Sequence, residues 1–211
     1  MSRFDDAAKT WDDEPKLARA RTVADLLRAT LPLKGVERVL DLGAGTGQLS
    51  LNLADAVGEI VVSDASKGMV EVASRNIMDA GLAEKMSALQ LDLTTQDTDL
   101  APFDGVWSML AFHHVPDMQR LLSRVQELLQ PGGWLAVVDL DQDPDGAFHA
   151  HVGDDFAGHH GFARDSFREQ LEAAGFEEVR IQDAGQVDKE LEVHGGHSQA
   201  FPMFLAVATR S

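Results

Sequence analysis

The 211-residue chain contains no cysteine, and it is poor in basic residues. Without cysteine there are no disulfide bonds, no thiolate ligands for metals and no catalytic thiol. Lysine and arginine total 18 against 35 aspartates and glutamates, which gives a formal net charge of −17. Charge of this sign repels the phosphates of nucleic acids and of anionic membranes. We therefore expect no nucleic acid and no membrane as a partner.

Long apolar runs and a leader-like start are missing as well. The most apolar stretches, such as WLAVVDL at residues 134–140, have the length of a strand and are far too short for a spanning helix. The first residues, MSRFDDAAKTWDDEPK, carry acids where a secretory signal needs a basic start and an apolar stretch. These features predict a cytoplasmic protein, and the length predicts a single domain over residues 1–211.

The remaining segments alternate between strand-like and helix-like patterns. Pro15 is well placed to open the first helix. Strands are expected at residues 36–43, 59–64, 86–92, 103–110, 132–141, 176–184 and 201–210, and helices at about 14–31, 46–56, 67–80, 118–129 and 165–174. Such alternation is typical of an α/β fold whose parallel sheet is covered on both faces.

A glycine-rich loop follows the first expected strand. Gly43, Gly45 and Gly47 come directly after the strand that ends near Asp41, and the missing side chains let a ligand touch the backbone at the carboxyl edge of the sheet. Asp64 closes the next strand, where a carboxylate can accept hydrogen bonds from both hydroxyls of a ribose. The spacing therefore indicates a nucleoside ligand.

The loop differs from the dinucleotide fingerprint GxGxxG, which places a pyrophosphate on a helix N-terminus. Here the loop reads GxGxG, and Asp41 precedes it. An acid at that position repels a phosphate and suits a cationic part of a ligand, such as the ammonium of an amino acid.

On these residues the chain resembles the class I S-adenosylmethionine (SAM) dependent methyltransferases, and the resemblance continues through FDGVWSMLAFHHV and LLQPGGWLAVVDLD. It is closest to small stand-alone bacterial-type enzymes, similar in motifs to the quinone-biosynthesis methyltransferases. The resemblance implies a Rossmann-like, doubly wound, seven-stranded sheet that is mostly parallel with an antiparallel last strand. It also implies an N-terminal helical lid, within residues 1–30.

The resemblance also implies a set of cofactor-binding residues. Asp64 would hold the ribose, Met69 would pack beside the adenine, and Asp92 would receive the adenine amino group. The full set is Asp41, Gly43, Ala44, Gly45, Gly47, Asp64, Ala65, Met69, Asp92, Leu93 and Ser108, with Ser108 near the methionine end. The alternative for each acid is that it only caps its own turn or helix, as short acids commonly do.

The acceptor side is less defined. His113 and His114 follow the fourth strand, where the family approaches the methyl group, and they are the candidate catalytic residues; the alternative is that they only pack within their turn. Phe4 and Trp11 of the lid are candidates for closing over the acceptor, or for patching the core from a frayed terminus.

The variable segment over residues 141–163 carries His149, His151, His159 and His160 among several acids. It should overhang the acceptor, and we assign tentative substrate binding to His149 and His151. A metal site is the alternative; we expect no metal, because no tight ligand spacing such as HxxxH appears. His194 and His197 are expected in a turn before the last strand.

The sequence therefore predicts a methyltransferase that uses SAM, releases S-adenosylhomocysteine (SAH), and acts on a small molecule as a monomer or homodimer. Whether oxygen, nitrogen or carbon is methylated stays open, because a fold does not identify an acceptor. Two alternatives are an NAD-type dehydrogenase on a related fold and a SAM-binding protein without catalysis.

Overall fold

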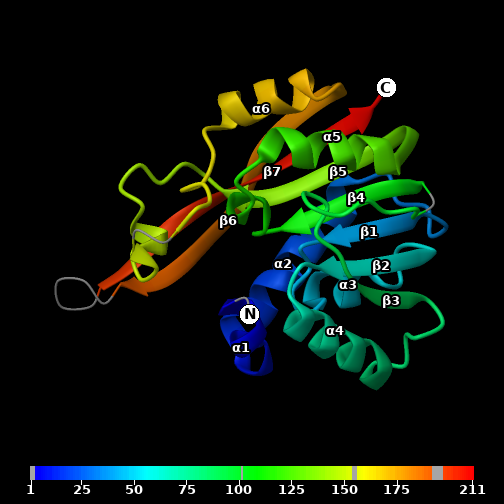
Figure 1. Cartoon of the computed structure of the whole chain (residues 1–211), viewed down its shortest axis with the longest axis horizontal. Coiled ribbons are helices and arrows are strands. Elements are labelled where there is room, and N and C mark those ends of the chain that lie inside the picture. Colours follow the sequence, from blue (N-terminus) through cyan, green and yellow to red (C-terminus); the bar gives the residue numbers. More distant parts are fainter. Residues whose placement is uncertain (1–2, 101, 154–155, 192–196) are drawn as a thin grey trace.

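The computed structural model describes residues 3–100, 102–153, 156–191 and 197–211. Its centre is a seven-stranded sheet in the order β3-β2-β1-β4-β5-β7-β6 (Figure 1). The strands are β1 (Arg38–Leu42), β2 (Glu59–Asp64), β3 (Met86–Gln90), β4 (Phe103–Met109), β5 (Leu129–Leu140), β6 (Phe176–Leu191) and β7 (His197–Arg210). The order reverses between β1 and β4, the position at which doubly wound sheets bind ligands.

Strand directions agree with the predicted fold class. The pairs β1–β2, β2–β3, β1–β4 and β4–β5 are parallel, and β7 runs antiparallel to both β5 and β6. The expected mostly parallel sheet with an antiparallel last strand is therefore confirmed. The β6–β7 ribbon is long and extends beyond the rest of the sheet (Figure 1).

Helices cover both faces of the sheet (Figure 1). On one face, apolar side chains such as Leu27, Leu53 and Ile77 form a core with the sheet, and on the other Val125 and Phe167 do so. The first face carries α2 (Glu14–Thr30), α3 (Gln48–Leu53) and α4 (Lys67–Asp79), and the second carries α5 (Met118–Leu128) and α6 (Arg164–Ala173). Burial of these two apolar layers fixes the sheet between them.

Local sequence explains where the helices near the glycine loop begin. Asp13 caps α2 by accepting a hydrogen bond from the backbone N–H of Lys16, and the proline lies in the first turn, as expected. The helix expected over 46–56 is shorter, because Gly47 takes a left-handed conformation with φ of 81° and α3 starts only after it. Ser66 caps α4 by accepting from the N–H of Met69.

Short elements complete the edge of the sheet that carries the site. They are α1 (Arg3–Ala7) and the 3-10 turns η1 (Ala8–Thr10), η2 (Phe112–His114) and η3 (Ala147–His149). The N-terminal helix α1 lies beside α4 (Figure 1). In the described ranges, we find no helix with the length and apolarity that a membrane crossing requires.

The segment after β5 leaves the sheet and returns to it. The backbone N–H of Phe162 donates to the carbonyl of Leu140 at 3.0 Å, and that of Asp143 donates to the carbonyl of His160 at 2.7 Å. Arg164 makes two hydrogen bonds of 2.7 Å to the carboxylate of Asp141. The segment is therefore closed at its base, which holds the residues between over the carboxyl end of β4 and β5.

Candidate functional site

The glycine loop is built from backbone conformations that favour glycine. Gly43, Gly45 and Gly47 have φ angles of 68°, 57° and 81°, in the left-handed region that costs a residue with a side chain roughly 1–2 kcal/mol. The backbone N–H of Ala44 donates to the carbonyl of Ser63 at 2.9 Å, which ties the loop to the end of β2. The loop is therefore held in one conformation by the strand beside it.

Two of these glycines have different surroundings. A Cβ on Gly43 would lie 2.4 Å from the Cβ of Ala111, so this glycine lets the turn after β4 approach the loop. A Cβ on Gly45 would instead make only ordinary van der Waals contacts, with the indole Nε1 of Trp11 at 3.8 Å and the sulfur of Met69 at 4.0 Å. The space over Gly45 is thus framed by the two side chains that sequence reasoning placed at the lid and at the adenine.

Asp64 lies at the same loop. Its carboxylate accepts hydrogen bonds from the backbone N–H groups of Gly45 and Ser66, both at 2.8 Å. Burial raises the pKa of Asp64, and these two hydrogen bonds act in the opposite direction. Each carboxylate oxygen still has a lone pair to offer a hydroxyl. The carboxylate therefore shapes the loop and remains able to accept further hydrogen bonds.

Asp41 lies beneath the loop and is only 1% exposed. One of its carboxylate oxygens, Oδ2, accepts a hydrogen bond of 2.6 Å from the hydroxyl of Ser50. The other, Oδ1, is buried and has no hydrogen-bond partner in the part of the chain that the structure describes. Burial, with a smaller effect of the charge of Asp64, raises the pKa of Asp41 to about 7, although hydrogen bonds from Ser50 and Trp107 act in the opposite direction. A buried acceptor of this kind needs a donor, which a ligand can supply.

Two predicted cofactor residues use their polar atoms within the protein. The Asp92 carboxylate accepts hydrogen bonds from Thr94 and from the hydroxyl of Thr95; burial raises the pKa of Asp92, but these bonds outweigh it and the net shift is downward. The hydroxyl of Ser108 donates to the carbonyl of Leu42 at 2.7 Å. Capping of its own turn accounts for the contacts of Asp92, so its role toward an adenine stays a prediction.

The other predicted cofactor residues lie along the same edge. Met69 and Leu93 are buried, which suits an apolar wall. Ala65 is exposed, and its carbonyl accepts a hydrogen bond of 3.0 Å from the amide of Gln90. Their positions are compatible with the implied cofactor contacts without testing them.

The N-terminal segment is docked on the glycine loop by two acids. Asp12 accepts hydrogen bonds from the hydroxyl of Thr46 at 2.5 Å and from the amide of Gln48 at 2.8 Å. Asp5 accepts one from the hydroxyl of Ser66 at 2.6 Å. The sequence did not predict the role of either acid, because their hydrogen-bond partners lie 34 and 61 residues away and no local pattern indicates such a contact.

Aromatic rings connect this lid to the histidines after β4. The ring centroids of Trp11 and Phe4 are 5.8 Å apart, and those of Phe4 and His114 are 5.2 Å apart, both in edge-on arrangements. Edge-on contact is a favourable geometry for aromatic pairs. The glycine loop and the histidine turn are therefore two sides of one site under the lid.

His113 is held by a buried acid that sequence reasoning did not select. Its ring Nδ1 lies 2.5 Å from the Oδ1 of Asp139, its backbone N–H donates to Oδ2 at 3.1 Å, and the backbone N–H of Leu140 donates to Oδ1 at 2.7 Å. The other ring nitrogen, Nε2, is buried and lacks a hydrogen-bond partner among the described residues. The place of Asp139 at the end of β5, beside β4, was the available signal.

The two histidines assigned to substrate binding point to different places. His149 is 2% exposed; its ring centroid lies 5.1 Å from that of His113, and it stacks on Phe156 at 3.8 Å. His151 is exposed, with its Nδ1 3.0 Å from the ammonium of Lys189 on β6. Only His149 therefore joins the histidines after β4.

The remaining histidines that the structure describes supply no ligand atom close to those of His113, His114 and His149, although the ring centroid of His160 lies 5.8 Å from that of His149. The ring of His159 lies against Phe162, with centroids 5.2 Å apart, and His160 is exposed. His197 begins β7 and so is not in a turn, whereas His194 lies outside the described residues.

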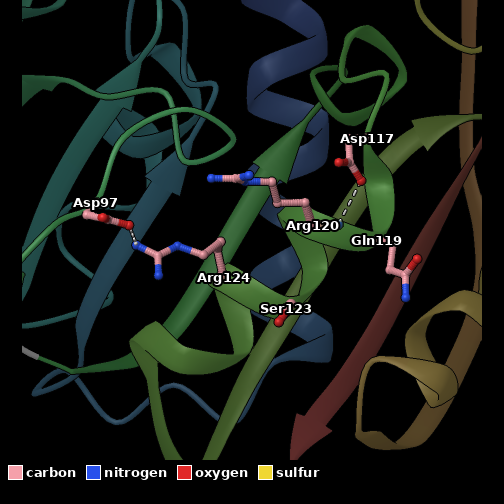
Figure 2. Close-up of a pocket in the computed structure, with 6 residues that line it drawn as sticks. All are labelled: Asp97, Asp117, Gln119, Arg120, Ser123 and Arg124. Atoms are coloured by element: carbon pink, nitrogen blue, oxygen red, sulfur yellow. Dashed lines mark hydrogen bonds and ion pairs between the residues drawn. The ribbon is translucent and has the colours of Figure 1, made fainter.

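A separate hollow lies on the surface beside α5. Figure 2 shows its polar lining, in which Arg124 forms an ion pair of 3.1 Å with Asp97. The hollow has a volume of about 410 Å³ and is lined by Asp97, Asp117, Gln119, Arg120, Ser123 and Arg124. It includes none of the residues of the glycine loop or of the histidine turn, and we do not place the candidate site there.

Comparison with known proteins shows which proteins this chain resembles. Residues 39–133 match the family model described as a methyltransferase domain, which spans the glycine loop, Asp64, Asp92 and the histidine turn. The chain is 31% identical over 133 residues to the 27-O-demethylrifamycin SV methyltransferase of Amycolatopsis mediterranei (strain S699), covering 62% of this chain and 49% of that protein. It is 33% identical over 117 residues to the demethylmenaquinone methyltransferase of Clavibacter sepedonicus, covering 56% and 46%.

The chain thus spans about half the length of these two curated relatives. Among solved structures, the YcgJ protein of Bacillus subtilis matches with a TM-score of 0.75 and 20% identity over 89% of this chain and 97% of that one. At this identity the match shows the fold. Motifs and family match agree that residues 39–133 form a methyltransferase domain, and the fold is one that solved methyltransferase structures share.

Proposed function

We propose that this protein transfers a methyl group from SAM to a small-molecule acceptor and releases SAH. The observation that carries the proposal is the glycine loop at Gly45, whose backbone is left uncovered by any side chain of its own. It is framed by Trp11, by Met69 and by the carboxylate of Asp64. In this arrangement Asp64 accepts the ribose hydroxyls, and the neighbouring apolar side chains contact the adenine.

The buried acid below the loop favours SAM over a dinucleotide. Asp41 Oδ1 is a buried acceptor that lacks a hydrogen-bond donor among the described residues. An ammonium group can donate to it, directly or through a water molecule. The pyrophosphate of NAD would bring negative charge to a loop already flanked by Asp41 and Asp64. The dehydrogenase alternative is therefore disfavoured by the electrostatics of the site.

SAM supplies a methyl group on a sulfonium, and its departure leaves a neutral thioether. The work left to the chain is to align the acceptor with the methyl group and to exclude water. Phe4 and Trp11 serve the second task, since their rings lie between the glycine loop and the histidines. The lid is held in place for this by Asp5 and Asp12.

The acceptor binds on the other side of Phe4, at His113, His114 and His149. Phe148 and Phe156 contribute apolar walls there, with Phe148 6.2 Å from His113 and Phe156 5.8 Å from His114, measured between ring centroids. This lining suits a molecule with an apolar body and a hydroxyl group. The hydroxyl proton is lost beside the histidines as the new bond to the methyl carbon forms.

Calorimetric titration with SAH and with NAD tests the cofactor, and methyl-labelled SAM added to a metabolite extract tests the reaction. We expect SAH to bind, NAD not to bind, and label to enter one or a few small hydroxylated molecules. Binding of NAD without SAH would overturn the proposal. Binding of SAH with no label in any small molecule would leave a SAM-binding protein without catalysis.

A further inference from the structure

Three histidine rings from two separate segments meet at the acceptor side of the site. His113 and His114 come from the turn after β4, and His149 comes from η3 in the segment after β5. One ring nitrogen of each can be chosen so that all lie within 4.8 Å of one another. His113 and His149 are buried and His114 is half-buried, so the group lies inside the protein with one member reaching toward solvent.

We propose that these three histidines bind one divalent transition-metal ion, and Zn²⁺ is the probe for it. A carboxylate only accepts hydrogen bonds, so the contact with Asp139 places the hydrogen of His113 on Nδ1 and leaves the lone pair on Nε2. A histidine that donates one ring N–H to a carboxylate while the other nitrogen binds the metal is the usual arrangement around protein zinc.

Because His113 Nε2 is buried without a hydrogen-bond partner among the described residues, its lone pair lowers the stability of the fold, and a bound metal ion would remove this free-energy cost. His113 Nε2 is buried, and the residues at 3–100, 102–153, 156–191 and 197–211 offer it no hydrogen-bond partner. A buried polar atom left unsatisfied costs about 1–3 kcal/mol. Coordination of a metal ion satisfies the atom and draws the other two rings toward it, since zinc lies about 2.0–2.1 Å from each imidazole nitrogen.

The two segments are joined by a hydrogen bond, and this contact holds the three histidines in fixed positions relative to one another. The backbone N–H of His159 donates to the carbonyl of His113 at 2.7 Å, which joins the segment after β5 to the turn after β4. His149 is fixed by its stacking on Phe156, with ring planes only 11° apart. Preorganised ligands of this kind favour a metal ion over solvent.

The donor set decides the class of ion. Three neutral imidazole nitrogens favour zinc and other first-row transition metals, whereas magnesium and calcium prefer oxygen ligands. Three protein ligands leave one position of a tetrahedral ion open, as in catalytic zinc sites. The proposal overturns the expectation from sequence that no metal binds; that expectation considered only the spacing within residues 141–163, and two of the ligands lie elsewhere.

The open position gives the ion a role that rests on the proposed function. An acceptor hydroxyl placed there becomes more acidic, as water does on catalytic zinc. Its proton passes to solvent, the oxygen forms a bond to the methyl carbon, and the carbon–sulfur bond breaks with its electron pair going to sulfur. The step is an in-line displacement in which nothing is oxidised or reduced.

The binding claim is tested on the full chain without SAM or acceptor. After treatment with a chelator and its removal, the protein is titrated with Zn²⁺ by calorimetry and with Co²⁺ by visible absorption. We expect one ion per chain and the intense absorption of four-coordinate Co²⁺. His149→Ala should lower Zn²⁺ affinity by at least about 100-fold, and Asp139→Asn by about 10- to 100-fold, the usual cost of losing such a partner.

His151→Ala is the matched control, because it removes a histidine two residues away whose ring faces Lys189. We expect it to keep the affinity of the unmutated protein. Equal affinities in His149→Ala and His151→Ala, or no stoichiometric uptake by the unmutated protein, would overturn the metal site. Thermal unfolding of each variant verifies folding.

SAH titration of the same preparations separates the two proposals. Absence of Zn²⁺ uptake by the unmutated protein, with normal SAH binding, overturns the metal site and leaves the proposed function standing. Failure of the unmutated protein to bind SAH, with stoichiometric Zn²⁺ uptake, overturns the proposed function and leaves the metal site.

Discussion

The ring Nδ1 of His113 lies 2.5 Å from the Oδ1 of Asp139, and both side chains are buried. The contact follows from the sheet: β4 and β5 run parallel side by side, so the turn after one meets the end of the other. The same carboxylate accepts hydrogen bonds from two backbone N–H groups, which hold the side chain of Asp139 in place. The orientation of the His113 ring is therefore set by the fold, before any ligand binds.

Replacement of Asp64 tests the ribose contact. We expect Asp64→Ala to weaken SAH binding by about 1.5–3 kcal/mol, the range for hydrogen bonds to a charged group. Calorimetry measures the change, and Asp117→Asn is the control, since Asp117 only caps α5 far from the loop. Unchanged SAH affinity in Asp64→Ala would remove this residue from the cofactor site.

Gly45→Val tests the space over the loop. The side chain would occupy the position between Trp11 and Met69, so we expect a folded protein that no longer binds SAH measurably. Gly81→Val is the matched control: Gly81 has a similar positive φ of 70°, and nothing lies within 4 Å of its Cβ position. Both variants share the backbone strain, so a common loss of stability is expected, and only the first should lose SAH. Retained SAH binding in Gly45→Val would contradict the placement of the cofactor.

The sequence was sufficient for the fold and for the position of the glycine loop. Strand periodicity, Pro15 and the glycines are local signals, and they predicted α2 and the strands other than β6 to within four residues; β6 runs to Leu191 and was predicted to end at residue 184. The helix after Gly47 was predicted too long at both ends: it ends early, at Leu53, and the left-handed conformation of Gly47 delays its start. Helix patterns in the sequence do not predict this late start, because the residues before α3 are themselves compatible with a helix.

The contacts that complete the site could not be predicted from the sequence. Asp139 ends a strand and reads as a turn cap, and only the pairing of β4 with β5 brings it to His113. His149 and His151 alternate in sequence, yet η3 sends one to the histidine turn and the other to Lys189. Side chains that meet through a long segment depend on its tertiary packing, which periodicity does not encode.

Asp41 should make the stability of the protein depend on pH. Burial raises its pKa to about 7 in the folded chain, whereas an unfolded aspartate has a pKa of about 3.9. The folded state therefore binds the extra proton between these values, so the stabilisation is complete below pH about 4 and is lost as pH rises through about 7. We expect Asp41→Asn to gain stability over the unmutated protein as pH rises, by about 3 kcal/mol between pH 5 and pH 8, because about two pKa units lie between pH 5 and the folded pKa and each is worth about 1.4 kcal/mol. Urea unfolding at pH 5 and pH 8 measures the difference, and an equal pH dependence in both proteins would contradict it.

Asp12 should hold the lid closed. We expect Asp12→Ala to speed the release of SAH by about two- to tenfold, since each of its hydrogen bonds is worth about 0.5–1.5 kcal/mol. Acrylamide quenching should rise in the same variant, because Trp107 and Trp134 are buried and Trp11 is the accessible tryptophan. Asp6→Ala is the control, an exposed acid in helix α1 of the same N-terminal segment. Similar release rates in the two variants would exclude the docking role of Asp12.

Changes to the histidine group should lower the rate of methyl transfer and leave cofactor affinity unchanged. If a divalent ion bound by His113, His114 and His149 acidifies the acceptor, a chelator will abolish methyl transfer and added Zn²⁺ will restore it, while SAH affinity stays the same. His149→Ala should then lower kcat through the lost ion, whereas His151→Ala should leave kcat unchanged, because its ring faces Lys189 and not the histidine group. Both are measured on the acceptor that labelled SAM identifies. Activity that survives the chelator while His113→Ala loses it would instead assign proton removal to the free imidazole of His113, held by Asp139.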